Sequence, residues 1–288
     1  MSREEKTLYL VDGSSYIHRA FHAVRNLSNS KGLPTNAIFG FSRMLLKLLA
    51  DKKPSHIAVV FDAKGPTFRH ELYDQYKATR PPAPEDLSVQ FPYIREIVQG
   101  LGLAMVEKEG YEADDVIGTL ARLGEEQGYR IMVVTGDKDF RQIVSPSITL
   151  WDTMKDKVTS YGTFTEEYGL EPEQMIDVMA LSGDSSDNIP GVQGVGEKTA
   201  IDLVKQFGTL EKVFENVEGV KKAKLKENLA RFRENALLSR RLVALDREVP
   251  LDLGPDELKT GGPDQKKLGE IFRELEFRDL WEKFAPQE

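Results

Sequence analysis

Short apolar runs alternate with amphipathic stretches through the first half of the chain, and this alternation constrains the fold more than any other feature. Runs of the kind that form buried strands lie at Leu8–Val11, Ile57–Phe61, Leu103–Val106 and Ile131–Val134. Between them, Asn36–Asp51 and Glu112–Gln127 carry apolar residues at helical spacing. Strands that alternate with helices predict an α/β fold with a mostly parallel central sheet flanked by helices.

The pattern divides the chain into two parts. Residues 1–172 are expected to form the α/β core, and residues 173–288 a helical region with helices near Glu197–Phe207 and Lys221–Leu238. Residues 64–87 interrupt the alternation and are expected to leave the sheet as an excursion. A helix within them should run up to about Thr79, because residues that precede proline avoid the helical conformation and Pro81 follows.

Acidic residues follow three of the predicted strands, at Asp12, Asp62 and Asp137. The carboxyl ends of parallel strands meet at one edge of a sheet, which is where open α/β proteins place their sites. Each acid alone is also compatible with an ordinary turn or with the first turn of a helix. With the acids near them in the sequence, the set that could gather at this edge has nine members: Asp12, Asp62, Glu112, Asp114, Asp115, Asp137, Asp139, Asp184 and Asp187.

Nine gathered carboxylates would repel one another strongly, and bound divalent cations are the simplest compensation. The chain has no Cys and only four His, which show no paired spacing. Ligands that are all oxygen atoms favour Mg²⁺ or Mn²⁺, and two or more such ions would support phosphodiester hydrolysis without a protein nucleophile. The motifs for acyl transfer, P-loop nucleotide hydrolysis and hydride transfer are absent from the sequence.

The net charge of −8 is unevenly distributed along the chain. Between Gly191 and Arg247, twelve Lys or Arg face eight Asp or Glu, a net charge of +4 that could meet nucleic-acid phosphates. The longest apolar run has five residues, whereas a bilayer span needs about 20. Since the polar N-terminus also has no signal-peptide core, we expect a cytoplasmic protein without membrane contact, and a monomer by default.

A glycine-rich segment at Ile189–Ala200 has the pattern of a helix–hairpin–helix, within about residues 189–207. Its glycines would let backbone N–H groups approach a phosphate, and the helix that follows would offer its N-terminus to the same anion. Backbone carbonyls of the hairpin could also hold K⁺. An ordinary turn is the alternative. The expected DNA-binding residues are Gly191, Gly194, Gly196, Lys198 and Thr199.

Lys77 and Arg80 lie three residues apart, so in a helix they would share a face. Beside an acidic metal cluster they could draw the scissile phosphate toward the ions and offset charge in the transition state. A solvated basic face is the alternative. Tyr76 could stack on a displaced base, although a packing role for this ring is at least as compatible with the sequence.

Together these segments resemble the 5′-nuclease domain of bacterial DNA polymerase I, within the flap-endonuclease superfamily. The resemblance covers about residues 7–284, and its motifs are Leu10–Ser15, Phe61–Lys64, Tyr76–Pro82, Gly110–Asp115, Thr135–Asp139 and Gly183–Ala200. It implies a PIN-like 5′-nuclease core, a helical arch at about residues 64–87 that admits a 5′ single strand, and a C-terminal helix–hairpin–helix region.

The resemblance also implies a function in replication and repair, in the bacterial nucleoid. All nine acids match the family's metal-site positions, Lys77 and Arg80 match its basic gateway, and Arg19 resembles a DNA-contacting position, with a salt bridge as its alternative. The implied substrates are displaced 5′ flaps and RNA-primed DNA. That family continues into polymerase domains, so attachment to or action with a DNA polymerase is a further expectation.

Two other functions stay open at this point. A non-catalytic module that binds DNA junctions would keep the hairpin without turnover, although it would gain nothing from nine mutually repelling acids. A metal-dependent ribonuclease of the PIN type would keep the acids, although the hairpin and the helices after it favour duplex DNA.

Overall fold

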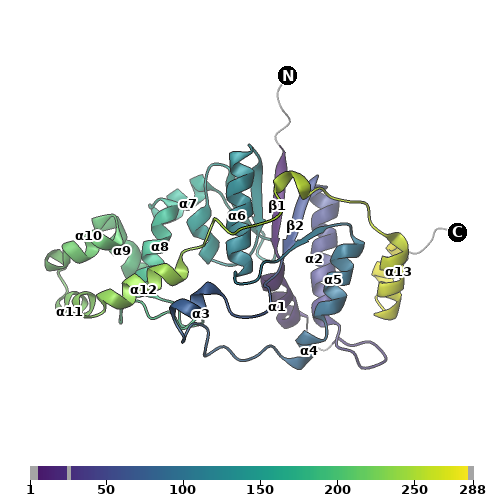
Figure 1. Cartoon of the computed structure of the whole chain (residues 1–288), viewed down its shortest axis with the longest axis horizontal. Coiled ribbons are helices and arrows are strands. Elements are labelled where there is room, and N and C mark those ends of the chain that lie inside the picture. The colour runs from purple at the N-terminus through teal and green to yellow at the C-terminus, as the bar shows by residue number, and fades with distance from the viewer. Residues whose placement is uncertain (1–5, 25–26, 285–288) are drawn as a thin grey trace, which may run out of the picture.

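A six-stranded sheet runs through the middle of the protein, in a computed structural model that describes residues 6–24 and 27–284 (Figure 1). The first five strands pair in parallel and β6 is antiparallel to β5. This confirms the predicted mostly parallel sheet. In the order β3-β2-β1-β4-β5-β6, the strands are β1 (Thr7–Asp12), β2 (His56–Val60), β3 (Ala104–Val106), β4 (Arg130–Val134), β5 (Ile148–Asp152) and β6 (Lys157–Thr159).

Helices cover both faces of the sheet (Figure 1). One face packs against α1 (Gly13–Ala23), α2 (Asn36–Lys52), α5 (Phe91–Gly100), α13 (Gln265–Glu274) and α14 (Arg278–Phe284), and the other against α6 (Ala113–Glu126). Because side chains alternate along a strand, Val59 and Val60 enter the two different cores. Burial on both faces explains why the central strands read as continuous apolar runs.

The helical region extends away from the sheet at the left of Figure 1 and shares one core with α6. The predicted helix at residues 197–207 is confirmed, whereas the helix expected at residues 221–238 is divided at Phe232. The helices here are α7 (Tyr161–Tyr168), α8 (Met175–Ser182), α9 (Glu197–Phe207), α10 (Leu210–Glu215), α11 (Ala223–Arg231) and α12 (Arg233–Val243). None of the helices in the described ranges is long and apolar enough to cross a membrane.

Residues 64–87, the arch segment, leave the sheet as expected, but with little helix (Figure 1). Only α3 (Phe68–Leu72) and the start of α4 (Glu85–Ser88) are helical. The helix expected up to about Thr79 is wrong, because Lys77 has a positive φ of 56°. Its N–H donates to the carbonyl of Asp187, at 2.9 Å, instead of to a carbonyl of its own helix. A tertiary contact therefore overrides the local preference.

Candidate metal centre and nucleic-acid interface

Two neighbouring strands bring the first acids together. The chain leaves β1 toward β2 on one side and later adds β4 on the other side of β1, so β1 and β4 flank the switch point of the sheet. In open α/β sheets, ligands bind in the crevice at such a point. Asp12 ends β1 and Asp137 follows β4, and both line the same cavity, of about 290 Å³, together with Asp62.

Seven of the nine predicted carboxylates line this cavity, which we call the acidic cavity. Asp184 lies outside it, in a neighbouring cavity of about 340 Å³, where its Oδ2 pairs with the Nζ of Lys138 at 3.0 Å. Asp115 lines neither cavity. The seven are Asp12, Asp62, Glu112, Asp114, Asp137, Asp139 and Asp187.

Asp115 does not join the acidic cavity, contrary to the expectation for all nine acids. Its side chain is fully buried and forms a bidentate ion pair with Arg69, both N–O distances being 2.7 Å. Asp115 is the third residue of α6, one position after Asp114. Successive helical residues point about 100° apart, so Asp114 can face the cavity while Asp115 faces the protein interior.

Helix starts hold two of the acids in place. Asp12 is the N-cap of α1, and its Oδ1 accepts from the N–H of Ser15 at 3.0 Å while its Oδ2 accepts from the hydroxyl of Thr135 at 2.8 Å. The second acid is Asp62, which accepts from the N–H of Ala113, the first residue of α6, at 2.8 Å. Glu112 is the N-cap of the same helix. Helix N-termini carry partial positive charge, so they stabilise carboxylates there.

Crowding and burial alter the titration of the cavity acids. Burial raises the pKa of Asp12 to about 7, against the hydrogen bonds from Ser15 and Thr135, and the charge of Asp137 adds to the rise. Burial and the same neighbour raise the pKa of Asp139 to about 7. The pKa of Asp114 also lies well above its usual range, through burial and then the charges around it. These shifts show that the protein alone does not neutralise the cluster.

The donor set fits a divalent cation. Within the residues that the structure describes, no three acidic or histidine side chains are already arranged to hold an ion. However, the Oδ1 of Asp139 is buried without a hydrogen-bond partner, and an unpaired buried carboxylate oxygen is costly unless a cation or donor reaches it. Oxygen donors of this kind match the hard ions Mg²⁺ and Mn²⁺.

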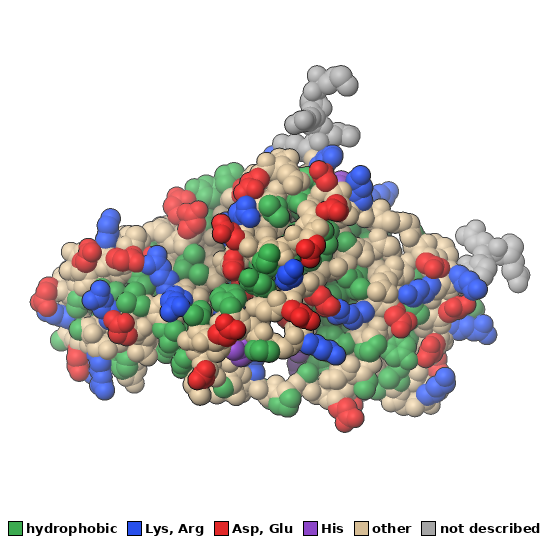
Figure 2. Space-filling model, in the orientation of Figure 1, with side chains coloured by type: hydrophobic (Ala, Val, Ile, Leu, Met, Phe, Trp, Pro, Cys, Tyr) green, Lys and Arg blue, Asp and Glu red, His purple; other side chains and the backbone are tan. Residues whose placement is uncertain are grey.

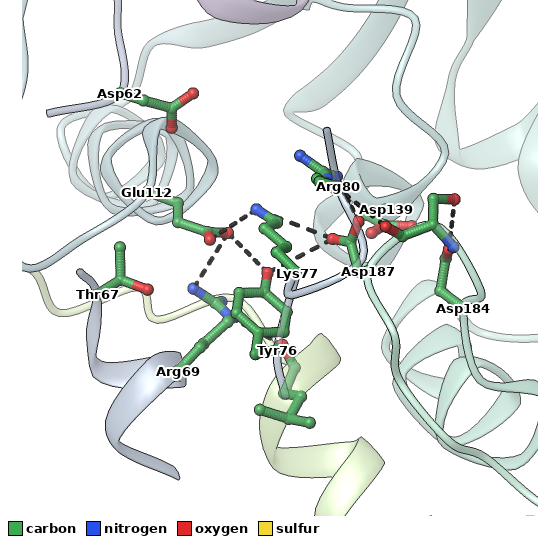
Figure 3. A network of polar contacts seen from close by, with 12 residues as sticks. Asp62, Thr67, Arg69, Tyr76, Lys77, Arg80, Glu112, Asp139, Asp184 and Asp187 are labelled. Atoms are coloured by element: carbon green, nitrogen blue, oxygen red, sulfur yellow. Dashed lines mark hydrogen bonds and ion pairs between the residues drawn. The ribbon is translucent and has the colours of Figure 1, made fainter. Parts of the chain in front are cut away.

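Basic residues of the arch segment meet the acids across the cavity (Figure 3). The Nζ of Lys77 lies between Glu112, at 2.7 Å, and Asp187, at 3.9 Å. Arg80 pairs with Asp187 and donates to the carbonyl of Ser186 at 3.4 Å. Because Lys77 is not in a helix, the two cations converge through this loop rather than through a shared helical face.

Tyr76 is buried, which supports its packing role and not a stacking platform. Its ring is 3% exposed, and its hydroxyl donates to Glu112 at 3.1 Å. His70 contacts the ring edge-on, with the ring centroids 5.3 Å apart. A displaced base could not reach the ring face, so the expectation of stacking at Tyr76 is wrong for this structure.

Two family models divide the chain between them. The model "5′-3′ exonuclease, N-terminal resolvase-like domain" matches residues 7–169, and "5′-3′ exonuclease, C-terminal SAM fold" matches residues 170–266. The chain belongs to the 5′-3′ exonuclease family. The first model ends at residue 169 and the second begins at residue 170, and the sequence predicts a boundary at residue 172.

Curated relatives of this 5′-3′ exonuclease family member are of two lengths. DNA polymerase I of Bacillus caldotenax is 46% identical over 284 residues, which cover 97% of this chain and 32% of the relative. The 5′-3′ exonuclease of Aquifex aeolicus is 41% identical over 276 residues, which cover 96% of this chain and 94% of the relative. The chain thus spans about a third of the length of the polymerase relatives.

Solved structures share the fold of this family member. The bacteriophage T5 flap endonuclease in a complex with DNA and metal ions aligns with a TM-score of 0.70 at 20% identity, covering 98% of this chain and all of the other. The catalytic core of Rad2 in complex with a DNA substrate aligns with a TM-score of 0.66 at 20% identity, covering 98% and 92%.

The predicted DNA-binding residues in and after the glycine hairpin (Ile189–Gly196) of this family member differ in their exposure to solvent. Gly194, Gly196 and Lys198 are exposed and Thr199 is half-buried, so they are open to a ligand. Gly196 caps α9 without a side-chain hydrogen bond, which leaves the first N–H groups of α9 free of a capping side chain. Gly191 is buried instead, and its N–H donates to the hydroxyl of Ser239 at 2.9 Å. Its expected phosphate contact is therefore wrong.

Arg19 lines the acidic cavity, but its guanidinium forms the salt bridge that was the alternative to a DNA contact. Its Nη2 lies 2.9 Å from Asp152, at the end of β5. A Cβ at Gly136 would lie 1.8 Å from the Nη1 of Arg19, so the guanidinium packs directly against the backbone of Gly136. The Nη1 of Arg19 is buried without a hydrogen-bond partner, so a DNA contact stays a prediction.

Three further residues of the site were not predicted from the sequence. Lys138 pairs with Asp184, and its position between Asp137 and Asp139 was a signal that could have found it. His18 lines the cavity from α1. Arg69 gave no signal, because an arginine buried by its partners has the same sequence appearance as one on a surface.

Proposed function

We propose that this chain is a structure-specific, Mg²⁺-dependent 5′ nuclease that hydrolyses phosphodiester bonds at junctions between a 5′ single strand and a duplex. The observation that carries the proposal is the acidic cavity, with seven carboxylates at the switch point of the sheet and two cations of the arch segment beside them. Its products would carry a 5′-phosphate and a 3′-hydroxyl. We infer displaced DNA flaps and RNA primers as its substrates, in replication and repair, because the relatives of this chain are DNA polymerase I and a 5′-3′ exonuclease.

The acids would divide the work of holding cations. Asp12, Asp114 and Asp139 have raised pKa values. Together with Asp137 and Glu112, which line the same cavity, they would hold the ions nearest the scissile phosphate. Asp184 and Asp187 come from the loop after α8, Asp184 in the neighbouring cavity and Asp187 in the acidic cavity, and would hold a more distant ion. A bound pair of Mg²⁺ or Mn²⁺ ions supplies an activated water and stabilises the attacking and leaving oxygens.

Lys77 and Arg80 would exchange partners when substrate binds. At present they neutralise Glu112 and Asp187. A phosphate that enters with cations would release both side chains toward its oxygens, Arg80 through its planar fork and Lys77 as a point charge. Their charges would then draw the phosphate to the acids and offset the charge that develops in the transition state.

The arch segment would admit the single strand. An opening of about 1160 Å³ lies between its two ends, and Figure 2 shows the molecule hollowed at its lower middle. Phe91, which is half-buried, offers aromatic surface there, and Lys64, Arg95 and Lys108 offer positive charge. Such a combination suits single-stranded nucleic acid. The opening and the acidic cavity share Ser14, His18 and Asp62, so a strand in one reaches the other.

The glycine hairpin would hold the duplex. Exposed Gly194 and Gly196 and the start of α9, with Lys198 and Thr199, suit a phosphate held without reading the base sequence. K⁺ bound by hairpin carbonyls would add to this contact. The distance from hairpin to acidic cavity would then select the bond that is cut.

Cleavage of a 5′-flap DNA with Mg²⁺, with a chelator, and beside a single-stranded RNA of equal length tests the proposal. We expect a single cut near the junction that needs Mg²⁺, and little cleavage of the RNA. Asp137→Ala should abolish cleavage and leave flap binding within a few-fold. Flap binding without any metal-dependent cleavage would favour the non-catalytic junction module, and preferred cleavage of the RNA would favour the PIN-type ribonuclease.

A further inference from the structure

The buried ion pair between Arg69 and Asp115 is a feature that the proposed chemistry leaves unused. Arg69 is 2% exposed and Asp115 is 0% exposed. Their two parallel N–O contacts of 2.7 Å form the bidentate geometry that arginine and carboxylate prefer. Removing two charges from water is costly, so such a pair persists only where every other polar atom is also satisfied.

Further contacts join the pair to residues 242–246 and to Glu112, whose Oε2 lies 3.6 Å from the Nη1 of Arg69. From Arg69, Nε donates to the carbonyl of Leu242 at 2.7 Å and Nη2 donates to that of Ala244 at 2.9 Å. Asp115 in turn accepts from the N–H of Asp246 at 2.9 Å and from that of Glu112 at 3.1 Å. The pair therefore ties the base of the arch segment and the start of α6 to the end of α12.

A second clamp joins the same stretch to the acids. The side-chain N–H groups of Gln142 donate to the carbonyls of Val243, at 2.9 Å, and of Asp139, at 3.0 Å. Its Oε1 accepts from the N–H of Leu245 at 3.0 Å. The end of α12 is thus fixed to Glu112 through Asp115 and to Asp139 through Gln142, and both acids line the cavity.

The same helix also holds the hairpin. Ser239, fully buried in α12, accepts from the N–H of Gly191 at 2.9 Å. Ser239 precedes Leu242 by three residues, which is less than one helical turn, or about 4.5 Å of rise. A single rigid turn of α12 therefore connects the base of the glycine hairpin to the ion pair beside the acidic cavity.

We propose that the Arg69–Asp115 pair is a positioning device that sets the distance between the glycine hairpin and the acidic cavity, and so the nucleotide at which the strand is cut. Asp115 acts through Arg69 and α12 and is not a metal ligand. This inference rests on the proposed nuclease function and deepens it.

Two single variants, the double variant and one matched control test the assignment on a single flap substrate of fixed sequence. Asp115→Asn and Arg69→Gln should each spread the cut over at least one additional nucleotide, and the double variant should be no worse than the worse single one. Mn²⁺ titrated alone into each variant by calorimetry should bind within about threefold of the wild type. Asp114→Asn, one position away in α6 but lining the cavity, should show the reverse pattern: Mn²⁺ binding at least tenfold weaker, with much slower cleavage whose residual product is still cut at the wild-type position.

Two results would overturn the inference. One is Mn²⁺ binding that is at least tenfold weaker in Asp115→Asn but unchanged in Arg69→Gln, which would make Asp115 a ligand. The other is an unchanged cut position in both variants. If Asp115→Asn and Arg69→Gln do not fold, Ser239→Ala and Arg69→Lys replace them, because these two variants loosen the same connection at its two ends. A wild-type cut position in both replacement variants would refute the inference. A wild-type protein that cuts no flap would defeat the proposed nuclease function itself, while the Mn²⁺ titrations would still decide whether Asp115 is a ligand.

Discussion

At the scale of single residues, Asp139 shows how a site can oppose the stability of its own fold. The carboxylate is crowded by Asp137, and one of its oxygens is buried without a partner. A charge in that position destabilises the metal-free protein and becomes useful only when a cation is held.

Asp139→Asn should therefore raise the melting temperature of the metal-free protein at pH 8, by about 2 °C for each kcal/mol gained. The amide oxygen can take the buried position and the amide nitrogen can face the cavity. Differential scanning calorimetry in a chelator measures the rise, and a flap assay should show that cleavage falls by about 100-fold or more. A lower melting temperature would show that the ionised form is stabilised in some other way.

Lys77 should contribute to the chemical step more than to binding, because its ammonium meets the acids directly. Lys77→Ala should lower the single-turnover rate by about 100-fold, the usual effect of removing one preorganised electrostatic contact, with the Kd for flap DNA within about threefold. Lys64→Ala is the control, because Lys64 lines the opening of the arch and not the acidic cavity. It should weaken binding and leave the single-turnover rate unchanged.

Individual side chains also mark where sequence interpretation succeeds. Asp12 and Asp137 could be predicted because parallel strands dictate where their ends lie. The sequence could not show that Asp115 and Gly191 have other roles than the acids and glycines near them. Adjacent residues of a helix point to different sides, and a glycine can be required by a tight turn as well as by a bound phosphate. Which of these roles applies depends on Arg69 and Ser239, both distant in the sequence.

At the scale of elements, the hairpin and α9 allow binding to be separated from folding. Gly196 has a negative φ, and a Cβ there would meet nothing within 4 Å. Gly191 has a φ of +55°, and a Cβ there would lie 2.4 Å from the backbone nitrogen of Gly183. The two glycines therefore have different reasons to be glycine.

Gly196→Val should raise the Kd for flap DNA at least tenfold while changing the melting temperature by no more than a few degrees, because the added methyl groups obstruct a phosphate but not the fold. Fluorescence anisotropy and thermal unfolding measure the two quantities. Gly254→Val is a matched control, since a Cβ at Gly254 is equally free of contacts and lies outside the hairpin. Unchanged affinity in Gly196→Val would contradict the hairpin assignment.

Elements differ in how far the sequence predicts them. The inner strands β1, β2 and β4 are predictable because burial on both faces leaves continuous apolar runs. The edge strand β3 keeps a shorter apolar run, of which only Val106 is buried. The strands β5 and β6 were not predicted from the sequence. β5 mixes Thr149 and Asp152 with its apolar residues, and β6 has only three residues, none fully buried. The non-helical backbone of Lys77 was not predicted, because it is fixed by a hydrogen bond to Asp187 in a loop that is distant in the sequence.

At the scale of the whole molecule, the crowded acids make stability depend on pH in an unusual direction. The pKa values of Asp12 and Asp139 are raised to about 7 in the folded protein, whereas an unfolded chain has ordinary values near 4. Between those values the folded protein binds more protons than the unfolded chain. Its free energy of unfolding therefore falls as the pH rises from about 4 to about 7.

The metal-free protein should consequently melt at a lower temperature at pH 7 than at pH 5.5, and excess Mg²⁺ at pH 7 should restore the loss by binding the ionised, folded form. Calorimetry in chelator and in Mg²⁺ across this range measures both effects. A melting temperature in chelator that rises with pH over this range would contradict the raised pKa values.

The core that α6 shares with the helical region has a mechanical consequence. Residues from both parts interdigitate in one apolar cluster, so a hinge between them would expose that cluster to water at considerable cost. We therefore expect the protein to meet its substrate as a fixed template. Bending must then come from the nucleic acid, and a branch point, where stacking is already interrupted, is the cheapest place on a DNA molecule to bend.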